Sequence, residues 1–279
     1  DELRRGKQFE RIVKWWLQND SARSRNIKTV WLWDEWPDCP GRDIGVDLVA
    51  ELVDGTLCAI QAKCYDAERD IPKSEIDGFI SAASPRTFSQ RWLVATTNGL
   101  SANARRTLHD NHVTFIPLAQ LETAAVAWPT HPDSLKAASR PDRAEPRPHQ
   151  LRAIRDVLSG LETNSRGQLI MACGTGKTLT ALWITERLDT NTTLVLVPSL
   201  NLLSQTLAEW AHHTKQDWTY ICVCSDDTVN KEDDQPITAT VDLPYPVTTK
   251  PSDIAHFLKS KGRKIVFSTY QSSAQVAKA

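Results

Sequence analysis

A glycine-rich loop at residues 171–178 most constrains how this chain can fold. It reads Met-Ala-Cys-Gly-Thr-Gly-Lys-Thr, follows the apolar run 168–171 and precedes a helical pattern over 177–188. The glycines let backbone N–H groups turn inward around a phosphate, and the N-terminus of the following helix adds partial positive charge. A strand, such a loop and a helix opening with Lys-Thr therefore predict a nucleoside triphosphate site in an α/β domain.

The residues of this loop have distinct expected roles. Backbone groups of Gly174, Thr175 and Gly176 would surround the phosphates, Lys177 would reach the β and γ phosphates, and the Thr178 hydroxyl would hold Mg²⁺. Only the end of the motif is strict, because its first position is methionine where glycine is usual. The alternative, a glycine-rich turn that binds nothing, is weaker because strand and helix patterns flank the loop.

Length and proline placement indicate two domains. A chain of 279 residues is long enough for about two. Prolines gather between Trp128 and His149, mixed with serine, aspartate and arginine, which is typical of a semi-extended linker. We therefore expect a first domain over 1–127, a linker over 128–147 and a second domain over 148–279. In the second domain, strand patterns alternate with helix patterns, which predicts a parallel sheet.

Composition limits the classes of partner and the cellular setting. The net charge of −1 means that any nucleic-acid binding must use local patches, and the basic residues of 4–28 are one candidate, although a solvated helix face explains them equally well. The six cysteines form no CxxC pair, which favours a reduced, cytoplasmic setting over a disulfide framework. No apolar run reaches membrane length, so no membrane association is expected.

The first domain has the pattern of an α/β sheet domain with a central hairpin. Asp54-Gly55 between two apolar strands is a strong hairpin signal. Apolar periodicity predicts the order αβββαβ, with elements at residues 3–19, 29–36, 45–53, 56–64, 73–83 and 91–96.

Polar residues on this hairpin indicate phosphodiester chemistry. Asp47 interrupts an apolar strand, while Gln61 and Lys63 share one face of the next strand. Asp47 and Gln61 could hold Mg²⁺, which activates a water, and Lys63 could orient that water or stabilise charge on the phosphate. Glutamine offers only a neutral oxygen, so Glu10 on the first helix could complete the site.

The register of the hairpin decides whether these residues can meet. A two-residue loop at 54–55 would put Asp47 opposite Ala62, on the wrong face from Lys63. The site therefore requires a three-residue loop or a bulge, with Gly55 in the left-handed conformation.

With Asp47 followed by Gln61-Ala62-Lys63, the first domain resembles the PD-(D/E)xK nucleases in their Mrr-like branch, which accepts glutamine at the acidic position. Residues 6–10 also look like the helix that opens such domains. The resemblance implies a restriction-endonuclease-like fold and catalytic roles for Asp47, Gln61, Lys63 and Glu10. Asp43 would play a supporting role.

Residues 140–279 resemble the first RecA-like lobe of superfamily 2 helicases and translocases. Residues 171–178 match its nucleotide-binding motif, and 146–150 resemble the upstream element whose glutamine, here Gln150, reads adenine. Further similarity at 197–205 and 267–272 implies DNA-backbone contacts, which position without specifying sequence. The residues that would make them are Ser199, Gln205 and Thr269.

The same lobe departs from the pattern of its relatives. No Asp-Glu-x-His or similar acidic pair is identified after an apolar strand anywhere beyond residue 178. We therefore expect an incomplete RecA-like domain, truncated before the Walker B strand, whose sheet exposes apolar edges. Such a lobe would bind ATP weakly and would not hydrolyse it efficiently.

A nuclease followed by a motor resembles the N-terminal part of single-polypeptide restriction–modification enzymes, the type ISP group. The resemblance implies a Mg²⁺-dependent endonuclease coupled to an ATP-driven motor on double-stranded DNA, acting against foreign DNA. The second motor lobe, a methyltransferase and a target-recognition domain would lie elsewhere in a longer polypeptide. Two alternatives stay open: a degenerate nuclease that only binds DNA for a helicase, which Gln61 favours, and an ATP-dependent repair or remodelling enzyme.

Overall fold

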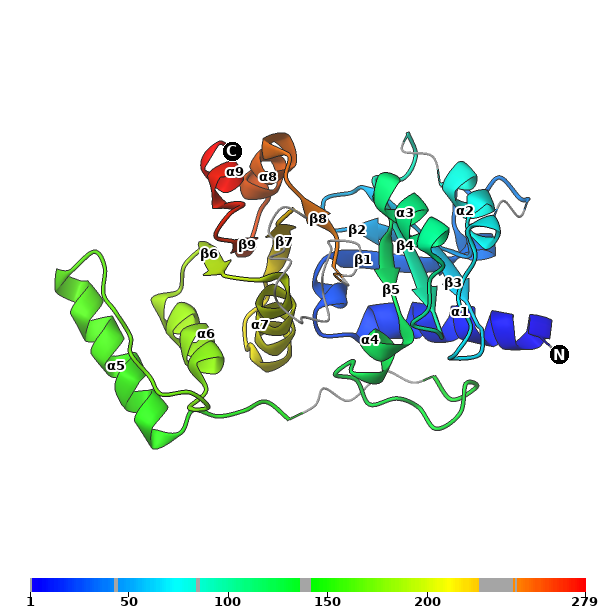
Figure 1. Ribbon diagram of the computed structural model, residues 1–279. Coiled ribbons are helices and arrows are strands. Elements are labelled where there is room, and N and C mark those ends of the chain that lie inside the picture. The colour runs from blue at the N-terminus through cyan, green and yellow to red at the C-terminus, as the bar shows by residue number, and fades with distance from the viewer. Residues whose placement is uncertain (1, 43–44, 84–85, 136–141, 226–242, 244) are drawn as a thin grey trace.

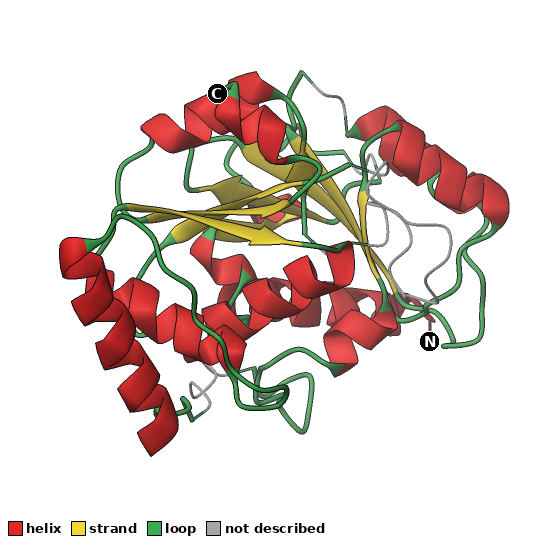
Figure 2. Ribbon diagram, turned by 60° about the vertical axis from the view of Figure 1, so that its left-hand side comes forward, coloured by secondary structure: helices red, strands yellow, loops and turns green. Residues whose placement is uncertain are grey.

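The computed structural model describes residues 2–42, 45–83, 86–135, 142–225, 243 and 245–279. Two α/β units lie side by side, each with its own sheet (Figure 1). Helices cover the strands from both sides (Figure 2). Among the described residues, no helix combines the length and apolar character needed to cross a membrane.

The first unit is built on a mixed five-stranded sheet in the order β1-β2-β3-β4-β5. The first three strands are antiparallel, whereas β3, β4 and β5 are parallel. The strands are β1 (Ile27–Leu32), β2 (Leu48–Leu52), β3 (Leu57–Lys63), β4 (Gln90–Ala95) and β5 (Thr114–Ile116). The helices are α1 (Glu2–Asn19), α2 (Asp77–Ala82), α3 (Ala102–Asp110) and α4 (Leu118–Glu122), with 3₁₀ turns η1 (Arg23–Arg25), η2 (Trp33–Glu35) and η3 (Lys73–Glu75).

Alternation along the strands divides the core of this unit into two layers. One layer packs Phe9 and Trp16 of α1 against Leu48 and Ile60 of the sheet. The opposite layer packs α2 and α3 against residues of the other parity, such as Val49. The predicted αβββαβ order is confirmed, although the helix expected at 73–83 is divided into η3 and α2.

The turn between β2 and β3 has the register that the site requires. Leu48 pairs with Ile60, so Leu52 lies opposite Thr56 and three residues form the loop. Gly55 has φ +83°, the left-handed conformation that an L side chain rarely adopts. The predicted three-residue turn is therefore confirmed.

A second irregularity lies at the other end of this hairpin. The Asp47 N–H donates to the Ile60 carbonyl at 2.9 Å, although Ile60 is already the partner of Leu48. Two residues of one strand thus face one residue of the other, as in a β-bulge. Because of the bulge, the regular ladder begins only at Leu48, and the side chain of Asp47 is redirected.

The second unit has a parallel four-stranded sheet in the order β6-β9-β7-β8. Its strands are β6 (Thr192–Val197), β7 (Thr219–Val223), β8 (Val247–Thr248) and β9 (Lys264–Thr269). Its helices are α5 (Pro148–Thr163), α6 (Lys177–Leu188), α7 (Leu200–His213), α8 (Pro251–Lys259) and α9 (Ser273–Ala277). Helices α5 and α6 lie at the end of the molecule farthest from the first unit (Figure 1).

The strand predicted at 168–171 is not formed, and this prediction was wrong. The segment is irregular, and Leu169 and Ile170 are 38% and 88% exposed. A strand needs a hydrogen-bonded neighbour, and the edge strand β6 pairs only with β9 among the described residues. An apolar run that has no partner strand therefore does not form a strand. Leu194 and Leu196 of β6 are 47% and 37% exposed, which matches the expected apolar edge.

The turn provides a test of the register argument. No atom lies within 4 Å of a Cβ placed on Gly55, so Gly55→Ala changes only backbone strain. We expect it to lower the free energy of unfolding by about 1 kcal/mol. In the same domain, Gly6 lies within α1 at an ordinary φ with equal space around it. Gly6→Ala should therefore raise the free energy of unfolding by about 0.5–1 kcal/mol. Urea denaturation measures both, and equal effects of the two variants would contradict a left-handed turn.

Candidate functional sites

The carboxylate of Asp47 lies at the end of the hairpin opposite the turn, beside the end of β3. There the bulge leaves the Ala62 N–H without a partner from β2. The Ala62 N–H donates to Asp47 Oδ2 at 2.8 Å, while the Asp47 N–H is bound by Ile60. The side chain therefore takes over a ladder hydrogen bond. This fixes the carboxylate in place beside β3.

The charges around Asp47 define the site. Burial raises the pKa of Asp47 to about 6, against the opposing effect of the Ala62 N–H. The negative charge of Glu10 also raises this pKa, while Lys63 and Lys7 lower it. Helix α1, with Glu10 and Lys7, and strand β3, with Lys63, thus bring a second carboxylate and two lysines into electrostatic reach of Asp47. Glu10 is 9% exposed and accepts a hydrogen bond from Lys7 Nζ at 3.0 Å.

Gln61 contributes an unused oxygen atom. Its side chain is 5% exposed, and its Nε2 donates to the Gly45 carbonyl at 3.1 Å. This bond orients the amide and leaves Oε1 buried without a hydrogen-bond partner. Such an acceptor is costly unless something binds it. A metal ion of the oxygen-preferring kind would fit this atom together with the Asp47 and Glu10 carboxylates.

The candidate metal site cannot be built from histidine, cysteine, aspartate and glutamate side chains alone. The described part of the chain contains no group of three or more such residues arranged to hold an ion. The set of Asp47, Glu10 and Gln61 has two such residues and an amide. Asp43, which was expected to support the site, lies outside the described residues.

Lys63 lies at the C-terminal end of β3, beside the end of β4. Its carbonyl accepts a hydrogen bond from the Thr96 N–H at 3.0 Å. The Thr96 hydroxyl donates to the Tyr65 carbonyl at 2.6 Å and accepts from the Tyr65 N–H at 2.7 Å. The chain on both sides of Lys63 is thereby held to β4.

Sequence reasoning did not place Thr96 or Lys7 at the site. Nothing in the local pattern marks Thr96, because its partners are about thirty residues away in sequence. Lys7 could have been found, since its position three residues before Glu10 on a helix puts both side chains on one face.

The loop at 171–178 has the backbone form expected of a phosphate cradle. Gly174 and Gly176 have φ +76° and +79°, and Gly176 caps the N-terminus of α6. The Thr175 hydroxyl and Lys177 Nζ both donate to the Ala172 carbonyl, at 2.7 and 3.1 Å. Lys177 is exposed, so its side chain is free to move toward an incoming anion. Thr178 follows it at the first turn of the helix.

Gln150 supports this loop from behind. It is 4% exposed, and its Nε2 donates to the carbonyls of Thr175 at 3.1 Å and Gly176 at 3.3 Å. Its Oε1 accepts from the Arg147 N–H at 2.8 Å. The φ of Gly176, +79°, favours glycine, and a Cβ there would also displace Gln150 Nε2, which would lie only 2.5 Å away. Contact of Gln150 with adenine stays a prediction, as does metal binding by Thr178.

The three residues expected to touch DNA differ in accessibility. The Ser199 hydroxyl accepts from the Leu202 N–H at 3.4 Å as the N-cap of α7. Gln205 is bound to Glu209 on the same helix at 3.0 Å. Thr269 is fully buried, so its side chain does not face a ligand here.

Comparisons with known proteins agree with this arrangement. Residues 18–136 match a family described as restriction endonuclease, and residues 143–278 match the res subunit of type III restriction enzymes. The predicted combination of an Mrr-like nuclease with a helicase-type domain is confirmed. No curated protein sequence matches the chain.

Solved structures extend the similarity over both units. The ATP-dependent type ISP restriction–modification enzyme LlaBIII, bound to DNA, matches with a TM-score of 0.83 and 31% identity. The match covers 99% of this chain and 19% of that chain, so the present chain spans about a fifth of the length of its relative. A nuclease-deletion mutant of the type ISP enzyme LlaGI, in complex with a DNA substrate mimic, matches at 37% identity with a TM-score of 0.40, over 49% of this chain and 14% of that chain.

The pKa of Asp47 gives a test that needs no substrate. Because this pKa is raised from 3.8 to about 6, the group favours folding below pH 4, and its contribution is lost as the pH rises through 6. Asp47→Asn keeps the acceptor for Ala62 and removes the charge. In metal-free buffer we expect the variant to be more stable than wild type by about 2 kcal/mol at pH 7.5 and equal to it at pH 4. Urea denaturation at both pH values measures this, and a difference independent of pH would contradict a raised pKa of Asp47.

Proposed function

We propose that this chain, which carries a restriction endonuclease domain followed by a helicase-type domain of the type III res-subunit family, cuts DNA at the β2–β3 hairpin and binds ATP at the 171–178 loop. The observation that carries the nuclease proposal is the electrostatic proximity of Glu10 and Lys63 to Asp47. The Gln61 Oε1 atom, buried on β3 without a hydrogen-bond partner, adds a further candidate ligand. We assign this activity to a restriction system, by similarity to the type ISP restriction–modification enzyme LlaBIII.

The residues of the first domain have separable roles in this proposal. Asp47, Glu10 and Gln61 Oε1 would hold Mg²⁺, which when bound supplies an activated water and neutralises phosphate oxygens. Lys63 stabilises the negative charge that develops on the scissile phosphate. The raised pKa of Asp47 supports the proposal, because a carboxylate that is costly to keep charged gains most from a cation.

The second domain handles a nucleotide in this proposal. Lys177, which here donates to the Ala172 carbonyl, would instead bind the β and γ phosphates of a nucleotide, and the Thr178 hydroxyl would hold its Mg²⁺. Gln150 keeps the loop open by fixing the carbonyls of Thr175 and Gly176 outward from the cradle. Double-stranded DNA is the proposed substrate of the whole, since the similar LlaBIII structure is DNA-bound.

One alternative has an observation in its favour. Gln61 is neutral, so a cation at the site would meet only two negative charges, from Asp47 and Glu10. A site of that kind could bind DNA without cutting it, as a binding module of a helicase.

Plasmid nicking separates the two functions. With Mg²⁺ or Mn²⁺ we expect the chain to convert supercoiled plasmid to the nicked form. Asp47→Ala should reduce the rate to background, and Lys63→Ala should reduce it by about a hundredfold or more, because each removes a charge that the reaction requires. Asp54→Asn, at the opposite end of the same hairpin, is the matched control and should nick normally. Plasmid that is bound but stays intact with every divalent ion would instead establish the binding module.

Nucleotide binding tests the second domain independently. Lys177→Ala removes the cation that contacts the phosphates, so we expect its affinity for a fluorescent ATP analogue to fall by about tenfold or more. Lys259→Ala removes an exposed lysine of α8 and should bind like wild type. Equal affinity of all three proteins would show that the analogue does not bind at the loop.

A further inference from the structure

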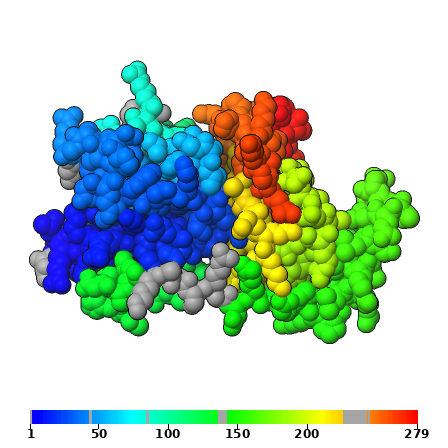
Figure 3. All heavy atoms as spheres, turned by 180° about the vertical axis from the view of Figure 1, so that it is seen from behind, coloured from blue at the N-terminus to red at the C-terminus, as the bar shows by residue number. Residues whose placement is uncertain are grey.

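The two domains make contact through a segment far in sequence from the linker. Residues 20–26, between α1 and β1, reach out of the first domain, and Ala22 is buried in the hydrophobic core of the second. In Figure 3 the blue surface of the first domain abuts the yellow surface of the second. The part of the second domain that receives the segment is residues 211–220, from the end of α7 to the start of β7, here named the α7–β7 corner.

Arg25 and Asn26 bind the backbone of this corner. The Arg25 guanidinium donates to the carbonyls of Gln216 at 3.1 Å and Ala211 at 3.2 Å, and lies 4.2 Å from the ring centre of Trp218. Asn26 Nδ2 donates to the Tyr220 carbonyl at 2.8 Å, and Asn26 Oδ1 accepts from the Tyr220 N–H at 3.0 Å. The amide thus pairs with β7 through both groups, as a neighbouring strand residue would.

Arg23 joins the two cores directly. It is 3% exposed, with its guanidinium 4.4 Å from the ring of Trp16 in the first domain and 5.0 Å from that of Tyr245 in the second. Asp20, itself 6% exposed, lies 3.9 Å from Arg23 and balances its charge. Separating the domains would take Tyr245 away from this buried cation and leave it only Trp16 as an aromatic partner, which is costly.

The linker docks on the same corner. The Ala144 N–H donates to His213 Nδ1 at 3.0 Å, and Lys215 pairs with Glu145 at 2.8 Å. The covalent and the noncovalent connection between the domains therefore converge on one short stretch of chain.

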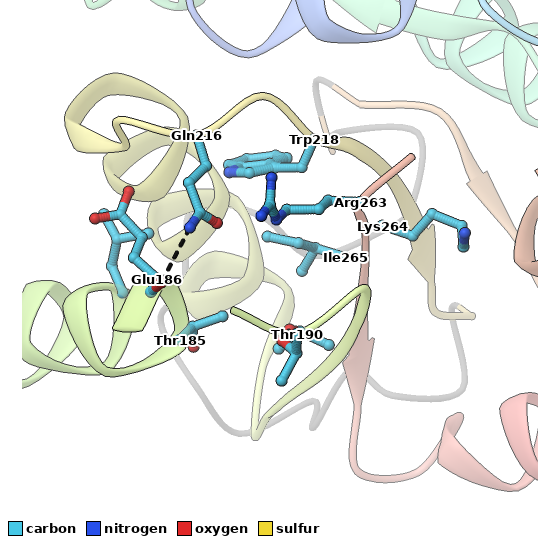
Figure 4. A pocket seen from close by; sticks show the side chains of 10 residues that line it. Thr185, Glu186, Thr190, Gln216, Trp218, Arg263, Lys264 and Ile265 are labelled. Atoms are coloured by element: carbon cyan, nitrogen blue, oxygen red, sulfur yellow. Dashed lines mark hydrogen bonds between the residues drawn. The ribbon is translucent and has the colours of Figure 1, made fainter. Parts of the chain in front are cut away.

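The helix that follows the phosphate-binding loop holds this stretch from the other side. Glu186, in the last turns of α6, accepts from the Thr214 hydroxyl and the Lys215 N–H, both at 2.7 Å. Its carbonyl accepts from Gln216 Nε2 at 3.0 Å, a bond drawn in Figure 4. A small crevice of about 10 Å³ adjoins this contact. Lys177 stands at the opposite end of this same helix.

We propose that the α7–β7 corner is a joint that couples helix α6 to helix α1, so that the two domains loosen and tighten as one cooperative unit. Two rigid elements end on the joint. Helix α6 begins at the loop proposed to bind phosphate, and helix α1, which carries Glu10, leads into the segment 20–26. A change that loosens one contact of the corner therefore weakens the other.

Hydrogen exchange of the nucleotide-free protein, followed by mass spectrometry, tests the joint. Glu186→Ala lies in the second domain, yet we expect it to speed exchange of the amides of 20–26 in the first domain by about tenfold, as for loss of one or two hydrogen bonds. Arg25→Ala should likewise speed exchange at 183–188. Glu186→Gln keeps the acceptor oxygen and should restore most of the protection.

The double variant and a control make the test decisive. If the corner couples the helices, Arg25→Ala combined with Glu186→Ala speeds exchange less than the product of the single effects. Lys28→Ala, which breaks only an exposed ion pair with Glu51 inside the first domain, should change neither segment. If Arg25→Ala does not fold, Asn26→Ala removes only the side-chain bonds to Tyr220 and serves in its place. Effects confined to the mutated domain, or multiplicative double-variant effects, overturn the proposal. Neither outcome depends on nuclease activity or ATP binding.

Discussion

The register between β2 and β3 is the constraint on which the candidate nuclease site depends. A three-residue turn with Gly55 in the left-handed conformation sets this register, and the bulge at Asp47 then turns its carboxylate toward the Ala62 N–H. A shift of one residue would move Gln61 and Lys63 to the opposite face of the sheet. The relative positions of the candidate site residues are therefore set by a turn that lies outside the site.

At this site the fold holds polar groups in surroundings that disfavour them when no cation is bound. The Asp47 carboxylate is kept where its charged form is disfavoured, close to a second carboxylate and two lysines. The Gln61 oxygen is kept without a partner by the bond from its own amide to the Gly45 carbonyl. Both features are unfavourable for the isolated protein, and an oxygen-binding cation would relieve both. Stability given up locally in this way is typical of functional sites.

Local patterns predicted the elements and the parts of the site that depend on a few neighbouring residues. The hairpin follows from Asp54-Gly55, and the positive φ of Gly174 and Gly176 follows from the loop motif. Features that depend on distant partners were missed. The segment 20–26 carries charges that suit a solvated surface, yet Arg23 is buried against Tyr245. The run 168–171 has the composition of a strand, but strand formation depends on a neighbour that the run itself cannot reveal.

The most direct test of the central claim is to locate a bound divalent ion. Crystals grown with Mn²⁺ and measured at a wavelength where manganese scatters anomalously would place the ion without assumptions about activity. The account predicts a peak within about 2.5 Å of oxygens from Asp47, Glu10 and Gln61, the range for oxygen-ligated divalent ions. Absence of an ion at Asp47, or an ion at Asp47 with the Gln61 amide turned away, would contradict it.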